Sequence, residues 1–167
     1  YRMLTIKTDD TDLGRICDSG QCFRMRRLDE SVDRVAISDR DILSAHGAKG
    51  AVYEIIAADR RILAMQTDDG IVLDCDDMEY ESFWREYLDM DTDYAAIRAS
   101  VDAEDKYLAD AVRTGRGLRI LKQELWEMIV TFLISQQNNI PRIHKCIDNI
   151  CVKYGEYKPC GDYYSFP

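Results

Sequence analysis

The sequence has few of the residues that build metal sites. Its 167 residues include two histidines, His46 and His144, which lie far apart, and six cysteines that form no Cys-x-x-Cys pair. Zinc sites draw on closely spaced cysteine and histidine ligands. We therefore expect no metal and no cofactor, and we interpret the cysteines as reduced, mostly buried thiols.

The chain also lacks long hydrophobic runs and a basic balance. No apolar run approaches the roughly 20 residues of a membrane span, and residues 1–7 lack a signal-peptide core. We therefore expect a cytoplasmic protein, associated with the nucleoid in a bacterium, with no membrane partner. The formal net charge of −9 argues against non-specific binding to nucleic acid, because phosphate contacts rely on Lys and Arg. Residues 115–154 differ, because they carry six basic and three acidic side chains.

The pattern of the first half predicts an antiparallel sheet, because short β-rich runs alternate with turn residues. Asp69-Gly70 is a strong signal for a type I′ hairpin. After residue 78 the apolar period becomes helical, and strands followed by helices indicate an α+β chain. We expect a sheet domain over residues 1–78 and a helical domain over residues 79–167. The predicted strands are Met3–Lys7, Cys22–Leu28, Arg34–Ser38, Ile42–His46, Val52–Ala57, Ile62–Gln66 and Ile71–Leu73.

A helical hairpin dominates the second half. Residues 125–134 are apolar on nearly every face, which is typical of a buried core helix. Residues 140–154 form a second, amphipathic helix, with Asn139 as its predicted cap and Pro141 in its first turn. The chain should turn sharply around Gln137 and Asn138.

The tip of this hairpin, residues 135–142, is rich in side-chain amides. One interpretation is an ordinary polar turn, because amides satisfy local backbone groups. The other is insertion among DNA bases, because an amide carries both a donor and an acceptor without net charge. The basic residues nearby favour insertion.

A second informative stretch runs from Asp18 to Arg24. It places Gly20 just before a predicted strand that carries Phe23 and Arg24. The stretch is either an ordinary turn or a place where a backbone carbonyl approaches a ligand closely, which glycine permits.

Together, residues 19–24, residues 117–123 and the hairpin resemble the 8-oxoguanine DNA glycosylase family, of the helix-hairpin-helix superfamily. The resemblance covers nearly the whole chain. It implies an antiparallel sheet domain like that of TATA-binding protein, followed by the first helices of a glycosylase domain. Members of this family extrude a damaged purine from duplex DNA, and a lysine attacks the sugar to form a Schiff base.

The resemblance also implies the roles of individual residues. The Gly20 carbonyl would face the extruded base. Because 8-oxoguanine carries a hydrogen on N7, where guanine presents an acceptor, the carbonyl would attract the damaged base and repel guanine. Arg142 would contact the estranged cytosine or its backbone. Family members usually have Asn where Gln137 stands, and often Trp where Met25 stands. We assign base recognition to Gly20, Gln21 and Phe23, and DNA binding to Gln137, Asn138, Asn139 and Arg142.

The family's helix-hairpin-helix, nucleophilic lysine and catalytic aspartate have no counterpart in residues 1–167, so no catalytic residue is assigned. We expect an N-terminal part of a repair enzyme whose partner is duplex DNA containing 8-oxoguanine. By itself this part should be inactive, and Trp126, Ile129 and Phe132 should be exposed on a helix face that can self-associate. A non-catalytic nucleic-acid- or protein-binding domain, and an acidic structural domain without a DNA role, remain the alternatives.

Overall fold

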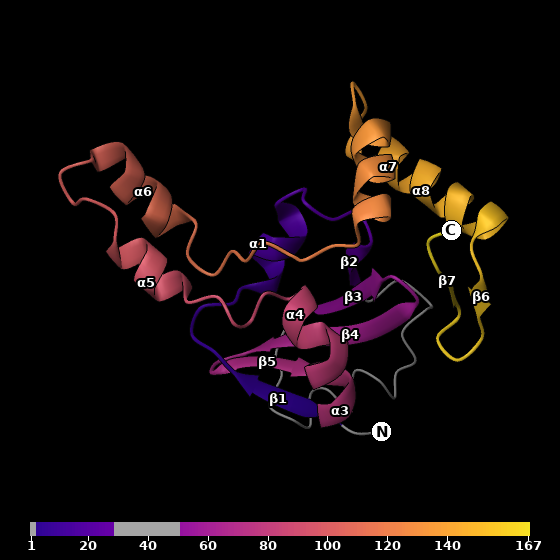
Figure 1. The fold of residues 1–167 in the computed structure, drawn as a ribbon, viewed down its shortest axis with the longest axis horizontal. Helices are drawn as coiled ribbons and strands as arrows, with labels where there is room; N and C mark the ends of the chain where they lie inside the picture. Colours follow the sequence, from indigo (N-terminus) through magenta and orange to yellow (C-terminus); the bar gives the residue numbers. More distant parts are fainter. Residues whose placement is uncertain (1–2, 29–50) are drawn as a thin grey trace.

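The computed structural model describes residues 3–28 and 51–167, and it shows an α+β chain (Figure 1). The predicted order of strands first and helices afterwards is confirmed. In chain order the elements are β1 (Leu4–Lys7), α1 (Leu13–Asp18), β2 (Met25–Leu28), β3 (Val52–Ala57), β4 (Arg60–Thr67), β5 (Gly70–Leu73), α3 (Asp77–Glu79), the π-helical turn η1 (Tyr80–Trp84), α4 (Arg85–Tyr87), α5 (Tyr94–Ala99), α6 (Lys106–Thr114), α7 (Leu125–Ser135), α8 (Ile140–Tyr154), β6 (Tyr157–Lys158) and β7 (Tyr163–Tyr164).

Five antiparallel strands form the main sheet in the order β1-β5-β4-β3-β2. Successive side chains of a strand point to opposite faces, so β3 contributes Ile55 to the larger core and Val52 to a second cluster on the other face. Leu13 of α1 and Trp84 of η1 join Ile55 in the larger core, and both are fully buried. The sheet is therefore covered on one face by α1 and by the continuous helix that α3, η1 and α4 form together, called the α3–α4 helix below.

The strand predictions hold with two corrections. β2 begins at Met25 rather than at Cys22. The β4–β5 hairpin forms, but it is not type I′, because its turn lies at residues 68–69 and neither has a positive φ. Gly70, with φ of 152°, is instead the first residue of β5. The strands predicted at 34–38 and 42–46 lie outside the described residues.

The helix predictions are largely confirmed. Trp84, Tyr87 and Leu88 share the buried face of the α3–α4 helix, and the Trp84 indole donates to the Glu79 carboxylate at 3.0 Å. Helix α1 was not predicted, because six residues are too few to show a period. Its cap, Asp12, accepts a hydrogen bond from the Arg15 amide at 3.0 Å. The domain boundary at residue 78 stays a prediction, since residues on both sides of it share the larger core.

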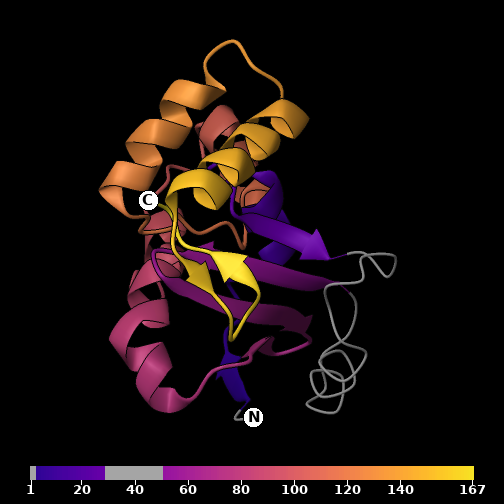
Figure 2. The same cartoon turned by 90° about the vertical axis from the view of Figure 1, so that its right-hand side faces the viewer.

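Helices α7 and α8 form the expected hairpin, whose tip points away from the sheet (Figure 2). The interpretation of α7 as a core helix is wrong for this chain: Leu125, Trp126, Met128, Ile129, Phe132 and Leu133 are all exposed. Its buried residues are the polar Glu127 and Thr131. The exposure expected for Trp126, Ile129 and Phe132 is confirmed. After α8, the β6–β7 hairpin returns along the sheet, where the Tyr163 hydroxyl donates to the Asp59 carbonyl at 2.5 Å.

Candidate nucleic-acid interface

The hairpin tip is built by its own amides. The Asn139 side chain caps α8 by accepting from the Arg142 amide at 3.1 Å, and the Asn138 side chain donates to the Ile134 carbonyl at 3.0 Å. Pro141 lies in the first turn, as predicted, where a missing N–H costs nothing. The amides of these two asparagines therefore hold the tip in shape, as the polar-turn interpretation expects, and their contact with DNA stays a prediction.

Gln137 differs from its neighbours. It adopts a left-handed conformation with φ of 50°, it is exposed, and its side chain has no hydrogen-bond partner within the described part of the chain. The Arg142 guanidinium is likewise exposed and without such a partner. The tip thus presents one amide and one guanidinium that are free to contact another molecule.

The loop before β2 holds Gly20 in a conformation that other residues adopt only with strain. Its φ is +73°, and a Cβ built on it would meet no atom within 4 Å, so its backbone borders open space. The sequence assigned Gln21 to base recognition, but its side chain binds protein backbone: Nε2 donates to the Arg119 carbonyl at 2.8 Å, and Oε1 accepts from the Leu121 amide at 2.9 Å. Gln21 therefore anchors the loop, and direct contact with a base stays a prediction.

Two parts of the chain that are far apart in sequence meet beside Gly20. A cavity of about 630 Å³ lies between the loop and α8. Phe23 contributes to its wall, as does His144, whose ring meets the Phe23 ring edge-on at 5.9 Å. The lining residues are Cys17, Asp18, Gly20, Cys22, Phe23, Met25, Arg26, Arg27, Ile140 and His144. The structure thus brings Gly20 and Phe23 together with the helix that carries the tip.

His144 was missed at the sequence level, although one signal was present. It is a polar residue between Ile140 and Ile147, on the apolar face of α8. Burial, and then the positive charge of Arg26, lower the pKa of His144, while the Phe23 backbone and Asp148 partly oppose the shift. This shift favours the neutral form of the imidazole.

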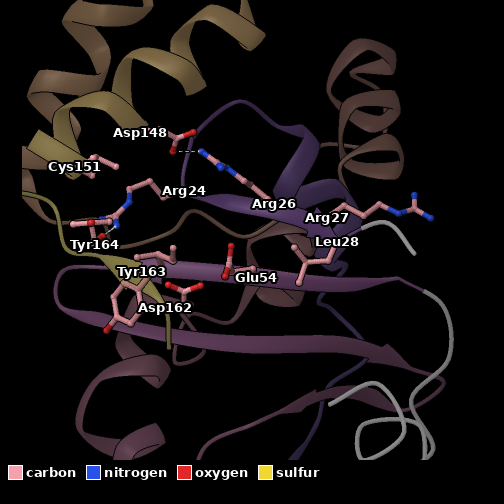
Figure 3. Close-up of a pocket in the computed structure, with 12 residues that line it drawn as sticks. Arg24, Arg26, Arg27, Leu28, Glu54, Asp148, Cys151, Asp162, Tyr163 and Tyr164 are labelled. Atoms are coloured by element: carbon pink, nitrogen blue, oxygen red, sulfur yellow. Dashed lines mark hydrogen bonds and ion pairs between the residues drawn. The ribbon is translucent and has the colours of Figure 1, made fainter. Parts of the chain in front are cut away.

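A second group of charges fastens α8 to the sheet (Figure 3). Arg26 reaches across a cavity of about 430 Å³ to the Asp148 carboxylate at 2.5 Å. Deeper, the buried Arg24 pairs with Glu127 of α7 at 3.4 Å and donates to the Tyr164 carbonyl. Burial raises the pKa of Glu127, and the nearby Arg24 opposes that shift. Because these arginines are paired within the protein, we assign them to positioning rather than to binding.

The basic stretch around the hairpin is also smaller than its residue count suggested. Arg119 is buried and turned inward, where it donates to the Thr11 hydroxyl at 2.8 Å and to the Asp89 carbonyl at 2.7 Å. Lys122 lies 3.5 Å from the Asp89 carboxylate. Gly117 makes this arrangement possible, since a Cβ there would lie 2.7 Å from the Asp12 Cβ. The exposed cations near the tip are therefore Arg142 and Lys145.

Within residues 3–28 and 51–167, no group of three or more His, Cys, Asp or Glu side chains could hold a metal ion. No helix of the same segments is long and apolar enough to cross a membrane.

Comparison with known proteins places this arrangement in a family. Residues 3–129 match the model of the 8-oxoguanine DNA glycosylase N-terminal domain. The chain belongs to that family. A curated relative, an N-glycosylase/DNA lyase of Saccharomyces cerevisiae, is 40% identical over 55 residues, which are 31% of this chain and 15% of the yeast protein.

Solved structures of 8-oxoguanine glycosylases share the fold. The apo form of the Clostridium acetobutylicum 8-oxoguanine glycosylase/lyase matches with a TM-score of 0.76 at 29% identity, over 97% of this chain and 54% of that one. The same enzyme with double-stranded DNA containing cytosine opposite 8-oxoG gives 0.75 at 29% identity, over 97% and 53%. A structure of MBOgg1 in complex with a low-affinity DNA ligand gives 0.74 at 31% identity, over 95% and 48%. This glycosylase-family chain therefore spans about half the length of these proteins.

Proposed function

We propose that this chain is the N-terminal part of a DNA repair enzyme that extrudes 8-oxoguanine from duplex DNA, excises it and cleaves the abasic strand. Its partner is then duplex DNA carrying the lesion. The observation that carries the proposal is the cavity beside Gly20, because one helix, α8, connects the cavity wall to the free Gln137 and Arg142 of the tip. The family match over residues 3–129 supports the same conclusion.

One backbone group, the Gly20 carbonyl, can distinguish 8-oxoguanine from guanine. A backbone carbonyl accepts a hydrogen bond from the N7–H of 8-oxoguanine and repels the N7 lone pair of guanine. The positive φ of Gly20 and the open space beside it leave this part of the backbone available to an extruded base. Phe23 offers an aromatic ring in the same cavity, suited to contact with a purine.

Replacement of Gly20 by alanine in the full-length enzyme tests this role. The new Cβ meets no protein atom, but it strains a left-handed backbone and projects into the open space. Discrimination between duplexes with 8-oxoguanine and with guanine should fall by about 1–3 kcal/mol, the worth of one buried hydrogen bond. Fluorescence anisotropy with the two duplexes measures the ratio of Kd values. An unchanged ratio would show that Gly20 does not read the base.

The chain by itself should be catalytically inactive. Schiff-base chemistry needs an amine at the sugar and a carboxylate that stabilises the developing positive charge. Lys145 and Lys153 are exposed on α8, outside the cavity lining, and are not assigned as nucleophiles. Borohydride treatment of this chain with 8-oxoguanine duplex should trap no covalent adduct, as judged by gel mobility. An adduct would show that a nucleophile does lie within residues 1–167.

A further inference from the structure

A contact between His144 and Phe23 joins the two halves of the interface. His144 lies on α8 two residues after Arg142, and Phe23 lies three residues after Gly20. Their rings meet edge-on, with centroids 5.9 Å apart and planes at 78°. Of the residues in the cavity wall, Ile140 and His144 are the two that α8 contributes.

The His144 imidazole has one nitrogen that is available for a further hydrogen bond. Nδ1 is buried and has no hydrogen-bond partner among the described residues. A buried, unpaired nitrogen costs free energy, so it marks a place where a partner belongs. The Phe23 backbone carbonyl interacts with the imidazole and opposes the lowering of its pKa, although no hydrogen bond to Nδ1 is completed.

We propose that His144 is a positioning residue for base recognition: it holds the 20–23 loop against α8, and its Nδ1 donates a hydrogen bond to the Phe23 carbonyl when the loop moves toward the helix. The proposal rests on the proposed function, since the loop it positions is the one that reads the base. Insertion of the hairpin tip and orientation of the Gly20 carbonyl are then connected through one side chain. Neither the family match nor the sequence assigns His144 such a role.

The charges around the imidazole make the contact sensitive to acid. Arg26 of β2 lies close to His144 and disfavours its protonation, whereas Asp148 of α8 favours it. Asp18 of α1 and Arg27 of β2 also line the cavity. Burial is the largest effect, and it lowers the pKa of His144 below the usual 6.5. Protonation leaves the Nδ1–H donor in place but puts a positive charge on a partly buried ring beside Arg26, so acid should disfavour the held position of the loop.

The first experiment uses the free chain. Hydrogen exchange of the amides of residues 20–23, corrected for intrinsic rates, is followed from pH 7.5 to pH 5 in the wild type and in two variants. His144→Phe keeps a ring without nitrogen, and His144→Asn keeps a donor without the ring. Asn149→Ala, an exposed change on the same helix, is the matched control. We expect protection of the loop to fall about tenfold with pH in the wild type. It should be low at every pH in the phenylalanine variant and largely retained, without pH dependence, in the asparagine variant.

The second experiment asks whether this positioning serves recognition. The ratio of Kd values for guanine and 8-oxoguanine duplexes should fall about tenfold in His144→Phe and be mostly rescued in His144→Asn. Wild-type behaviour of the phenylalanine variant in both experiments, or equal losses in the two variants, would overturn the proposal. A wild type that shows the acid response but no preference for the lesion would contradict the proposed function while leaving the loop-holding role intact.

Discussion

At the scale of single residues, Arg119 is a buried polar group with several hydrogen-bond acceptors around it. Its guanidinium donates to the Asp10 carbonyl at 3.1 Å, to Thr11 and to the Asp89 carbonyl, and it lies 5.0 Å from the centre of the Tyr94 ring. Arg119→Met should lower the free energy of unfolding by about 3–5 kcal/mol, because several buried acceptors lose their donor. Urea denaturation followed by tryptophan fluorescence measures the loss.

Arg113 provides the matched control. Its pairing with Asp110 at 3.0 Å is exposed, and exposed pairs of this kind contribute less than about 1 kcal/mol. Arg113→Met should therefore unfold close to the wild-type midpoint. If both variants lost the same stability, the convergence of contacts on Arg119 would have no energetic meaning.

At the scale of elements, the hairpin tip contains two kinds of amide side chain: Asn138 and Asn139 bind the local backbone, whereas Gln137 has no described partner. Asn139→Ala removes the cap of α8 and should cost about 1 kcal/mol of stability. Gln137→Ala removes an exposed side chain without a described partner, so stability should be unchanged, while extrusion of the base by the full-length enzyme should slow. Thermal unfolding and the fluorescence of a 2-aminopurine beside the lesion measure the two effects.

Salt dependence supplies a further check on the tip. Gln137 carries no charge, so its loss should leave the salt slope of DNA binding nearly intact, whereas Arg142→Ala should reduce the slope. Arg142→Ala should also relax the preference for cytosine opposite the lesion. If the Gln137 variant of the full-length enzyme extruded the base as fast as the unchanged enzyme, the hairpin would be only a connection between helices.

At the scale of the whole molecule, the exposed apolar face of α7 should govern solution behaviour. Trp126 is 57% and Phe132 62% exposed, and Met128, Ile129 and Leu133 of the same helix are exposed as well. These side chains therefore form a continuous apolar surface and are not isolated surface residues. We expect the chain to self-associate at micromolar concentration, and the double variant Trp126→Ser, Phe132→Gln to shift it toward monomer. Sedimentation velocity measures the change.

A matched variant removes an equally exposed ring elsewhere. Tyr107 on α6 is 85% exposed and lies on a part of the molecule that extends away from α7 (Figure 1). Tyr107→Ser should leave the association unchanged. A monomeric wild type would contradict the prediction, and a shift caused by Tyr107→Ser would place the contact on α6.

The sequence by itself determined the local features of this protein. β3 matches its predicted strand at both ends, and Asn139 and Pro141 take the predicted positions at the start of α8. These features depend on neighbours within a few residues, through side-chain alternation, capping geometry and the missing proline N–H, so they could be predicted from the sequence.

Only the tertiary structure decided how distant residues are used. Arg119 looked like part of a basic surface but is buried, because Gly117 lets the chain approach Asp12 closely enough for the guanidinium to turn inward. The Gln21 side chain forms its hydrogen bonds with the backbone of Arg119 and Leu121. Glu127 is buried on the otherwise apolar α7 because Arg24 lies opposite it. His144 meets Phe23 across 121 positions of sequence. Burial and pairing are properties of a three-dimensional neighbourhood, and no local pattern specifies which distant side chain will complete it.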